Sequence, residues 1–219
     1  EELGRAFAGV PVQTSGGSDV LASVQGGARV VVATIGAEPV ADGGYGAALL
    51  VDGWALLGRA DLRAAEDALR RWLTAAALTR PAAEGGRVVV VADPGDPTVQ
   101  ALVRWDPVGF AAAQLEQRAA VAFPPAVRIA VVDGALGSIE SLVESAALPP
   151  ETRVLGPVPL PDGAREPAFE GTEMLRMLLR TPRRDGLALA RALAQAHAVR
   201  TARKSDAPVR IQIDPIDIG

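Results

Sequence analysis

Residues 47–92 read AALLVDGWALLGRADLRAAEDALRRWLTAAALTRPAAEGGRVVVVA, and their pattern predicts the architecture of the first half of the chain. Short apolar runs at 47–51 and 87–92 predict two strands. Between them, residues 60–79 carry apolar side chains at helical spacing, which predicts one long helix. The continuous apolar run of the second strand is typical of a parallel strand that is buried on both faces. This strand–helix–strand order predicts an α/β unit with a parallel sheet.

The second half of the chain has a different order of elements. A helical region predicted at residues 98–122 ends at Pro124 and Pro125. The apolar pattern then predicts six elements. They are strands at residues 127–132, 152–155, 173–180 and 209–213, and helices at residues 138–146 and 186–199. This β-α-β-β-α-β order is typical of the ferredoxin-like arrangement. Residues 157–170 are rich in Pro and Gly and predict an exposed loop.

The composition predicts a soluble, cytoplasmic protein. The 219 residues are 49% hydrophobic, which is enough for the cores of two modest domains. No Cys is present, which argues against a disulfide-stabilised secreted fold and excludes a thiolate metal site. No apolar run approaches the roughly 18–20 residues that a membrane-spanning helix needs. The first residue is Glu1 rather than Met, which indicates a fragment of a longer protein.

Positive charge is concentrated toward the C-terminus, although the whole chain has a net charge of −4. Between residues 176 and 204, the arginines are accompanied by a single acid, Asp185. Such a stretch either contacts nucleic-acid phosphates or forms a solvated helix face, and the sequence leaves both interpretations open. The candidate DNA-binding residues are Arg180, Arg183, Arg184, Arg203, Lys204 and a predicted loop residue, Trp54, whose ring could stack on a base.

Four short motifs resemble those of one known family in their order and spacing. Residues 61–66 (DLRAAE) are similar to the family's D-F-R-A-x-E, and residues 114–125 (QLEQRAAVAFPP) to its E-L-x-x-R-x-x-x-x-Y-P-P. LGP at 155–157 and IDP at 213–215 resemble the family's L-G-P and its closing V-D-P. By these motifs the chain resembles the C-terminal part of primosomal protein N′ (PriA), the family of replication-restart helicases.

The resemblance implies a RecA-like helicase second lobe with a parallel sheet in residues 1–108, and a bridging helix plus a ferredoxin-like α+β domain in residues 109–219. It also implies a bacterial, nucleoid-associated primosome protein that recognises branched or stalled forks during DNA replication restart. The implied partners are DNA, other primosome proteins and single-strand-binding protein, with no membrane. ATP and zinc would belong to the full-length parent. The only histidine, His197, has no cluster of further ligands, so no metal site is predicted here.

The residues that would bind a nucleotide in this family are mostly replaced. Where the family reads G-T-Q-M-x-A-K-G, residues 32–39 read VATIGAEP, which puts Glu38 in the place of the lysine and Pro39 in the place of the final glycine. Pro39 also lacks a backbone N–H. The family's D-x-D after the next strand keeps Asp52 but has Trp54 at the second acid.

The family's arginine motif is also degenerate. Where the family reads Q-V-A-G-R-A-G-R, residues 74–81 read TAAALTRP, which puts Leu78 and Pro81 at the two arginine positions. Arg80 is one residue away, and one residue on a helix turns a side chain by about 100°. An arginine finger can raise the rate of phosphoryl transfer by about 10³ to 10⁵.

We therefore predict a helicase-like scaffold without a working motor and without catalytic, cofactor or metal-binding residues. Two alternatives stay open. One is an active ATP-dependent 3′–5′ DNA helicase with unconventional nucleotide contacts, and the other is a scaffold that binds only proteins.

Overall fold

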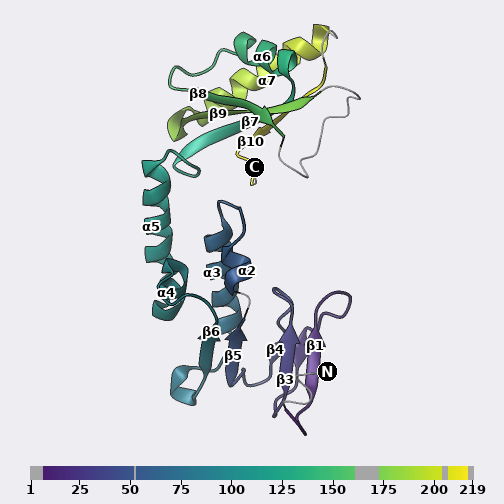
Figure 1. The fold of residues 1–219 in the computed structure, drawn as a ribbon, viewed down its shortest axis with the longest axis vertical. Coiled ribbons are helices and arrows are strands. Elements are labelled where there is room, and N and C mark those ends of the chain that lie inside the picture. Colours follow the sequence, from purple (N-terminus) through teal and green to yellow (C-terminus); the bar gives the residue numbers. More distant parts are fainter. Residues whose placement is uncertain (1–6, 52, 161–172, 204–206, 217–219) are drawn as a thin grey trace. The chain divides into compact units, whose positions relative to one another are not determined.

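The computed structural model describes residues 7–51, 53–160, 173–203 and 207–216. It divides the chain into two compact units, Glu1–Ala111 (unit 1) and Ala112–Gly219 (unit 2). Both units contain helices and strands, so the fold is a mixed α/β fold (Figure 1). Asp52, Lys204 and the side chain of Arg203 lie outside the described residues, as does most of the predicted loop at 157–170.

Unit 1 combines short strands with helices. Its strands are β1 (Val12–Ser15), β2 (Ser23–Val24), β3 (Val30–Ala33), β4 (Val40–Ala41), β5 (Ala47–Leu50) and β6 (Arg87–Val90). Its helices are α2 (Gly53–Leu57), α3 (Ala64–Ala76), the 3-10 helix η1 (Ala82–Glu84), α4 (Pro97–Arg104) and the beginning of α5 (Pro107–Ala120). The strands pair as β1–β3, β2–β4 and β5–β6, each in parallel. The parallel pairing predicted around the quoted stretch is thus confirmed for β5 and β6.

The single helix predicted at residues 60–79 is wrong in its bounds. A separate short helix, α2, precedes α3, and α3 ends before Leu78. There, Tyr45 N–H donates to the Leu78 carbonyl at 2.9 Å, and Arg80 N–H donates to the Tyr45 carbonyl at 2.9 Å. These two hydrogen bonds form a parallel bridge between the segment at Thr79 and Tyr45. The Leu78 carbonyl and the Arg80 N–H are therefore paired outside the helix rather than within a longer one.

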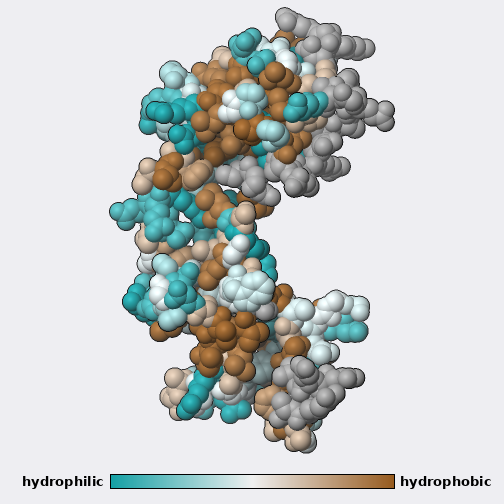
Figure 2. Space-filling view, viewed as in Figure 1, coloured by the Kyte–Doolittle hydropathy of each residue, from teal (hydrophilic) through white to brown (hydrophobic). Residues whose placement is uncertain are grey.

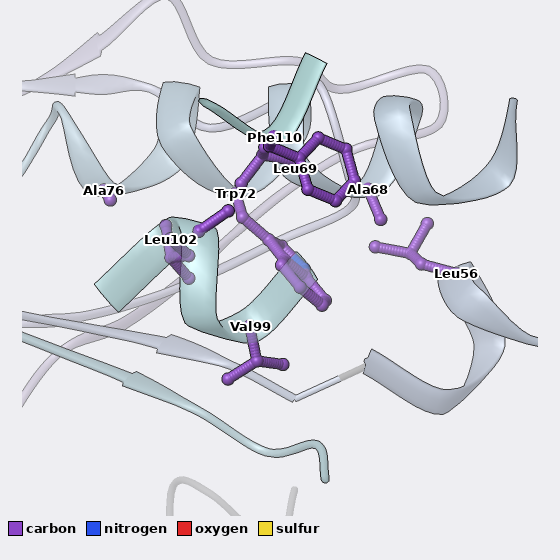
Figure 3. Packing of buried hydrophobic residues seen from close by; sticks show 9 residues of the cluster. Leu56, Ala68, Leu69, Trp72, Ala76, Val99, Leu102 and Phe110 are labelled. Carbon is purple, nitrogen blue, oxygen red and sulfur yellow. The ribbon is translucent and has the colours of Figure 1, made fainter. Parts of the chain in front are cut away.

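The core of unit 1 is formed where α2, α3, α4 and the start of α5 meet. Trp72 of α3 lies in it and is only 2% exposed. Figure 3 shows this side chain among those of its neighbours. The cluster consists of Leu56, Ala68, Leu69, Trp72, Ala76, Val99, Ala101, Leu102 and Phe110. Because α3 and α4 bring these residues together from segments far apart in the sequence, the core depends on both helices.

The β5–β6 pair is covered on one face only within the described residues. Leu50 and Val90 pack against the unit 1 core. Their neighbours Leu49 and Val89 alternate to the other face and are 67% and 49% exposed. Figure 2 shows an apolar area where Figure 1 places β5 and β6. The prediction that β6 is buried on both faces is therefore wrong for this structure.

The helical region predicted at residues 98–122 is divided into α4 and α5. Trp105, between them, has a left-handed φ of 54°, which ends α4. Pro107 then begins α5, and a proline disfavours helical geometry in the residue before it. The Asp106 carboxylate accepts the Gly109 N–H at 2.8 Å and so caps the new helix. The boundary between the two units falls on α5, close to the predicted domain boundary.

Unit 2 has the predicted β-α-β-β-α-β order. Its elements are β7 (Val127–Ala135), α6 (Leu136–Ser145), β8 (Arg153–Pro159), β9 (Met174–Pro182), the 3-10 helix η2 (Arg183–Asp185), α7 (Gly186–Arg203) and β10 (Val209–Ile213). The strands form one antiparallel sheet in the order β10-β7-β9-β8. In Figure 1, α6 and α7 lie on the same face of this sheet. The core between them consists of Ala130, Val132, Ile139, Leu142, Met177, Leu179, Leu189, Leu193 and Ala196.

Strand β8 extends into the segment predicted as a loop. It was expected to end at residue 155, but Val158 and Pro159 still pair with β9. The register shifts between Leu155 and Val158, where Gly156 has a φ of 99°. A bulge of this kind lets an edge strand contain a Gly-Pro pair and continue its pairing. The Gly and Pro residues predicted that the strand is interrupted after Leu155, but not that its pairing with β9 continues at Val158.

Candidate nucleic-acid interface

In the loop between β3 and β4, the carboxylate of Glu38 binds a backbone N–H of the same loop. The two carboxylate oxygens of Glu38 accept the backbone N–H of Gly36 at 3.0 and 2.9 Å. Gly36 has a φ of 85°, a left-handed conformation that favours glycine. An anionic ligand at this amide would have to displace Glu38 and would be repelled by its charge. Glu38 therefore opposes anion binding at this loop both sterically and electrostatically.

Buried polar contacts hold this loop in place. The Ser15 hydroxyl donates to the Ala37 carbonyl at 2.6 Å and accepts the Leu21 N–H at 3.0 Å. The Tyr45 hydroxyl donates to the carbonyl of Pro39 at 2.8 Å. Burial raises the pKa of the Tyr45 phenol, and the nearby positive charge of Arg29 opposes this rise. The loop thus has a defined conformation in which Pro39 is a packed structural residue.

Replacing Tyr45 with phenylalanine is expected to lower the free energy of unfolding by about 1 kcal/mol, because the Pro39 carbonyl loses its hydroxyl donor. The raised pKa of Tyr45 means that the folded state favours the neutral phenol. Its contribution to stability is therefore present below the unfolded-state pKa and is lost as the pH rises through the folded-state pKa. Urea titrations of both proteins at neutral and alkaline pH measure these effects, and equal stabilities at neutral pH would contradict the first.

Arg80 is used to bind the chain's own backbone. Its Nε donates to the carbonyls of Gly43 and Gly44 at 3.1 and 3.2 Å. Arg80 follows the end of α3, so the expectation that a helical turn rotates it away from a nucleotide is wrong in its geometry. Pro81 comes next and precedes η1. Through these hydrogen bonds, the segment that follows α3 contacts the loop before β5.

Trp54 lies on α2 rather than in the predicted loop. The preceding residue, Gly53, approaches the Val91 carbonyl so closely that a Cβ there would lie 2.6 Å from that oxygen. This contact places α2 directly beyond β5 and β6. The Trp54 side chain remains 78% exposed, so its ring is accessible for stacking on a base.

The described part of the chain contains no cluster of metal-ligating side chains. No group of three or more His, Asp and Glu side chains there could hold a metal ion. Asp61 accepts the Arg63 N–H at 2.8 Å, which is a turn-forming contact. His197 is exposed on α7. Among the residues described, no helix is both long and apolar enough to cross a membrane.

Much of the predicted basic patch is engaged in internal contacts. Arg180 donates to the carbonyls of Val121 and Ala122 at 3.4 and 3.3 Å. Arg183 donates to the Pro125 carbonyl at 3.0 Å. Arg184 pairs with the carboxylates of Glu151 and Asp185. The backbone of Arg203 ends α7, and its side chain and Lys204 are outside the described residues.

A further arginine of the same stretch is buried. The Arg176 guanidinium donates to both carboxylate oxygens of Asp133, at 2.9 and 3.0 Å. The two residues are direct partners in the β7–β9 register. Their side chains are 8% and 0% exposed, respectively. Arg176 is therefore a structural cation, which the excess of arginine in the sequence did not reveal.

Arg153 was not among the candidate residues identified from the sequence. It lies outside the basic stretch, but the β8–β9 register places it directly opposite Arg180. The predicted strands at 152–155 and 173–180 contained both residues. Their pairing register, which the sequence did not provide, is what brings the two charges together.

Comparison with known proteins gives matches over the whole chain. Residues 119–216 match the family model of the primosomal protein N C-terminal domain. The entire chain is 54% identical to a probable replication restart protein PriA of Mycobacterium leprae (strain TN), of which it covers 34%. It is also 54% identical to the protein of the same name from Mycobacterium tuberculosis (strain ATCC 25618 / H37Rv), of which it covers 35%. The chain thus spans about a third of the length of these curated relatives.

The domain match covers most of unit 2, and the identity to the relatives extends through unit 1 as well. The motifs quoted above from both halves of the sequence are consistent with these matches. These matches support a fragment of a replication restart protein PriA, in which residues 119–216 match the primosomal protein N C-terminal domain.

Proposed function

We propose that this chain is the non-motor, DNA-engaging part of a replication restart protein. In this proposal, residues 1–108 are a RecA-like helicase second lobe and residues 109–219 contain a ferredoxin-like domain. The parallel strand pairs of unit 1 support the first assignment. The unit 2 sheet supports the second, because its order places the fourth, first, third and second strands side by side.

The observation that carries the proposal is the carboxylate of Glu38 on the Gly36 N–H. A working motor lobe needs donors and cations near the phosphates that it acts on. Here the Glu38 carboxylate accepts the Gly36 N–H. Arg80 donates to the carbonyls of Gly43 and Gly44. Both features support a lobe that is retained as a scaffold and does not hydrolyse ATP.

The proposed substrate is forked or branched DNA, bound through phosphate contacts of unit 2. The relatives carry the name replication restart protein, which supports a role at forks. Other primosome proteins and single-strand-binding protein are the proposed partners, in the bacterial cytoplasm and nucleoid. ATP and zinc would be bound, if at all, by segments of a longer protein.

A second candidate function is a scaffold that binds only proteins. Two observations favour it, namely the internal contacts of Arg180, Arg183 and Arg184 and the exposed apolar face formed by Leu49 and Val89. The internal contacts do not use all the donors of these arginines, since each guanidinium has five N–H groups. DNA binding is therefore compatible with these contacts and remains the first proposal.

One pair of measurements on the full-length protein tests the proposal. We expect forked DNA to bind with an affinity that falls as salt rises, because phosphate contacts release counterions. We also expect no increase in ATP hydrolysis when the fork is added. Stimulated hydrolysis would contradict the loss of the motor and favour the helicase alternative. Absence of salt-dependent fork binding would instead favour the protein scaffold.

A further inference from the structure

Among the described residues of unit 2, Arg153 differs from most arginines in having no hydrogen-bond or ion-pair partner. Arg191 on α7 is the other such arginine among those whose side chains are described between residues 112 and 216. The remaining ones each contact a carboxylate, a carbonyl or another group, namely Arg118, Arg128, Arg176, Arg180, Arg183, Arg184, Arg200 and Arg210. Arg153 is exposed at the start of β8, so its five N–H donors are available to a ligand.

A second positive charge lies beside Arg153. Arg153 and Arg180 are directly opposed in the antiparallel β8–β9 register, so their side chains extend from the same face of the sheet. Leu179 belongs to the core beneath α6 and α7, and by strand alternation Arg180 lies on the opposite face. Like charges directly opposite each other are unfavourable in a sheet. An anion bound between the two guanidinium groups would remove this repulsion.

A pocket of about 350 Å3 adjoins this pair. Both arginines line it, and its walls include Val121, Val127 and Pro182. The lining contains one acid, Glu151, whose carboxylate is paired with Arg184. The lining is therefore positively charged overall. Its volume is at the lower end for a ligand cleft, where roughly 300–1,000 Å3 is typical, and exceeds that of a phosphate group alone.

We propose that Arg153 and Arg180 together bind one phosphate group of the DNA backbone at this pocket. Arginine is suited to this role because its planar guanidinium can donate two parallel hydrogen bonds to phosphate oxygens. Arg180 keeps its position through the carbonyls of Val121 and Ala122, while Arg153 provides the unengaged donors. The inference rests on the proposed DNA-binding function and assigns it a place at the β8–β9 end of the sheet.

The test compares Arg153→Gln with Arg191→Gln in the 219-residue chain. Arg191→Gln is a matched control, because it removes the same charge from the other arginine that has no partner among the described residues of unit 2. Binding of a fluorescent forked DNA is measured by anisotropy over a series of salt concentrations. One lost phosphate contact is expected to reduce the slope of log Kd against log salt by about 0.9 for Arg153→Gln. The slope of Arg191→Gln should equal that of the wild type.

Each outcome separates the pocket from the broader function. Salt-dependent fork binding by the wild type, with equal slopes for both variants, would overturn the pocket assignment and leave the proposed function standing. No salt-dependent binding by the wild-type chain would overturn both. Loss of binding to an acidic peptide in Arg153→Gln, with unchanged DNA binding, would assign the pocket to a protein partner instead. Equal thermal unfolding of the two variants shows that a change in slope does not come from misfolding.

Discussion

Replacing Asp133 with alanine is expected to destabilise unit 2 by about 3–5 kcal/mol. The carboxylate is fully buried and accepts two hydrogen bonds from Arg176, whose side chain is 8% exposed. Removing it leaves the positive charge of Arg176 buried without the carboxylate that compensates it. Hydrogen exchange of the β7 and β9 amides measures this loss within unit 2 itself.

Two further variants separate the buried charge from the loss of a contact. Glu151→Ala removes an exposed ion pair with Arg184 and should cost less than about 1 kcal/mol. The double replacement Asp133→Leu with Arg176→Met removes both buried charges and should recover most of the stability lost in Asp133→Ala. If Asp133→Ala were as mild as Glu151→Ala, the buried pair would not have the proposed structural role.

Replacing Trp72 with alanine should lower the stability of unit 1 by about 3–5 kcal/mol, because it leaves a cavity in the core between α3 and α4. Trp72 is 2% exposed and belongs to the cluster in Figure 3. Exchange rates of the α3 and α4 amides measure the effect. Partial collapse of the helices into the cavity would reduce the loss toward the lower value.

Trp54→Ala is the matched control for this experiment. It removes the same side chain from a position that is 78% exposed, so stability should change by no more than about 0.5 kcal/mol. An equal loss in the two variants would show that the Trp72 effect does not arise from core packing.

The order of the described elements of unit 2 could be predicted from the sequence because apolar runs and the Pro and Gly residues between them mark helices and strands locally. Hydrophobic alternation and helical spacing depend only on neighbouring residues. The bounds of α3 could not be predicted in the same way. The C-terminal end of α3 depends on Tyr45, whose backbone forms hydrogen bonds with Leu78 and Arg80, more than thirty residues away in the sequence. The break between α4 and α5 has a local cause in Pro107, which the helical pattern of the flanking residues obscured.

The candidate site was only partly accessible to sequence reasoning. By resemblance, Glu38 in the place of a lysine predicts the loss of a nucleotide contact, and this stays a prediction. The basic stretch, in contrast, suggested five equivalent cations. The structure engages Arg180, Arg183 and Arg184 in contacts that differ from one another. Charge counts in a sequence cannot make this distinction, because they do not report which acceptor each guanidinium meets in the fold.

The family resemblance and the order of the elements in unit 2 could be read from the amino-acid sequence, because motifs and periodicity are properties of residues close together in the chain. Which charged groups are available to a ligand depends on the tertiary fold. It buries Arg176 against Asp133 and places the unpartnered Arg153 opposite Arg180. This dependence arises from strand register, which pairs residues across β7, β9 and β8 through backbone hydrogen bonds and packing that act over long sequence distances.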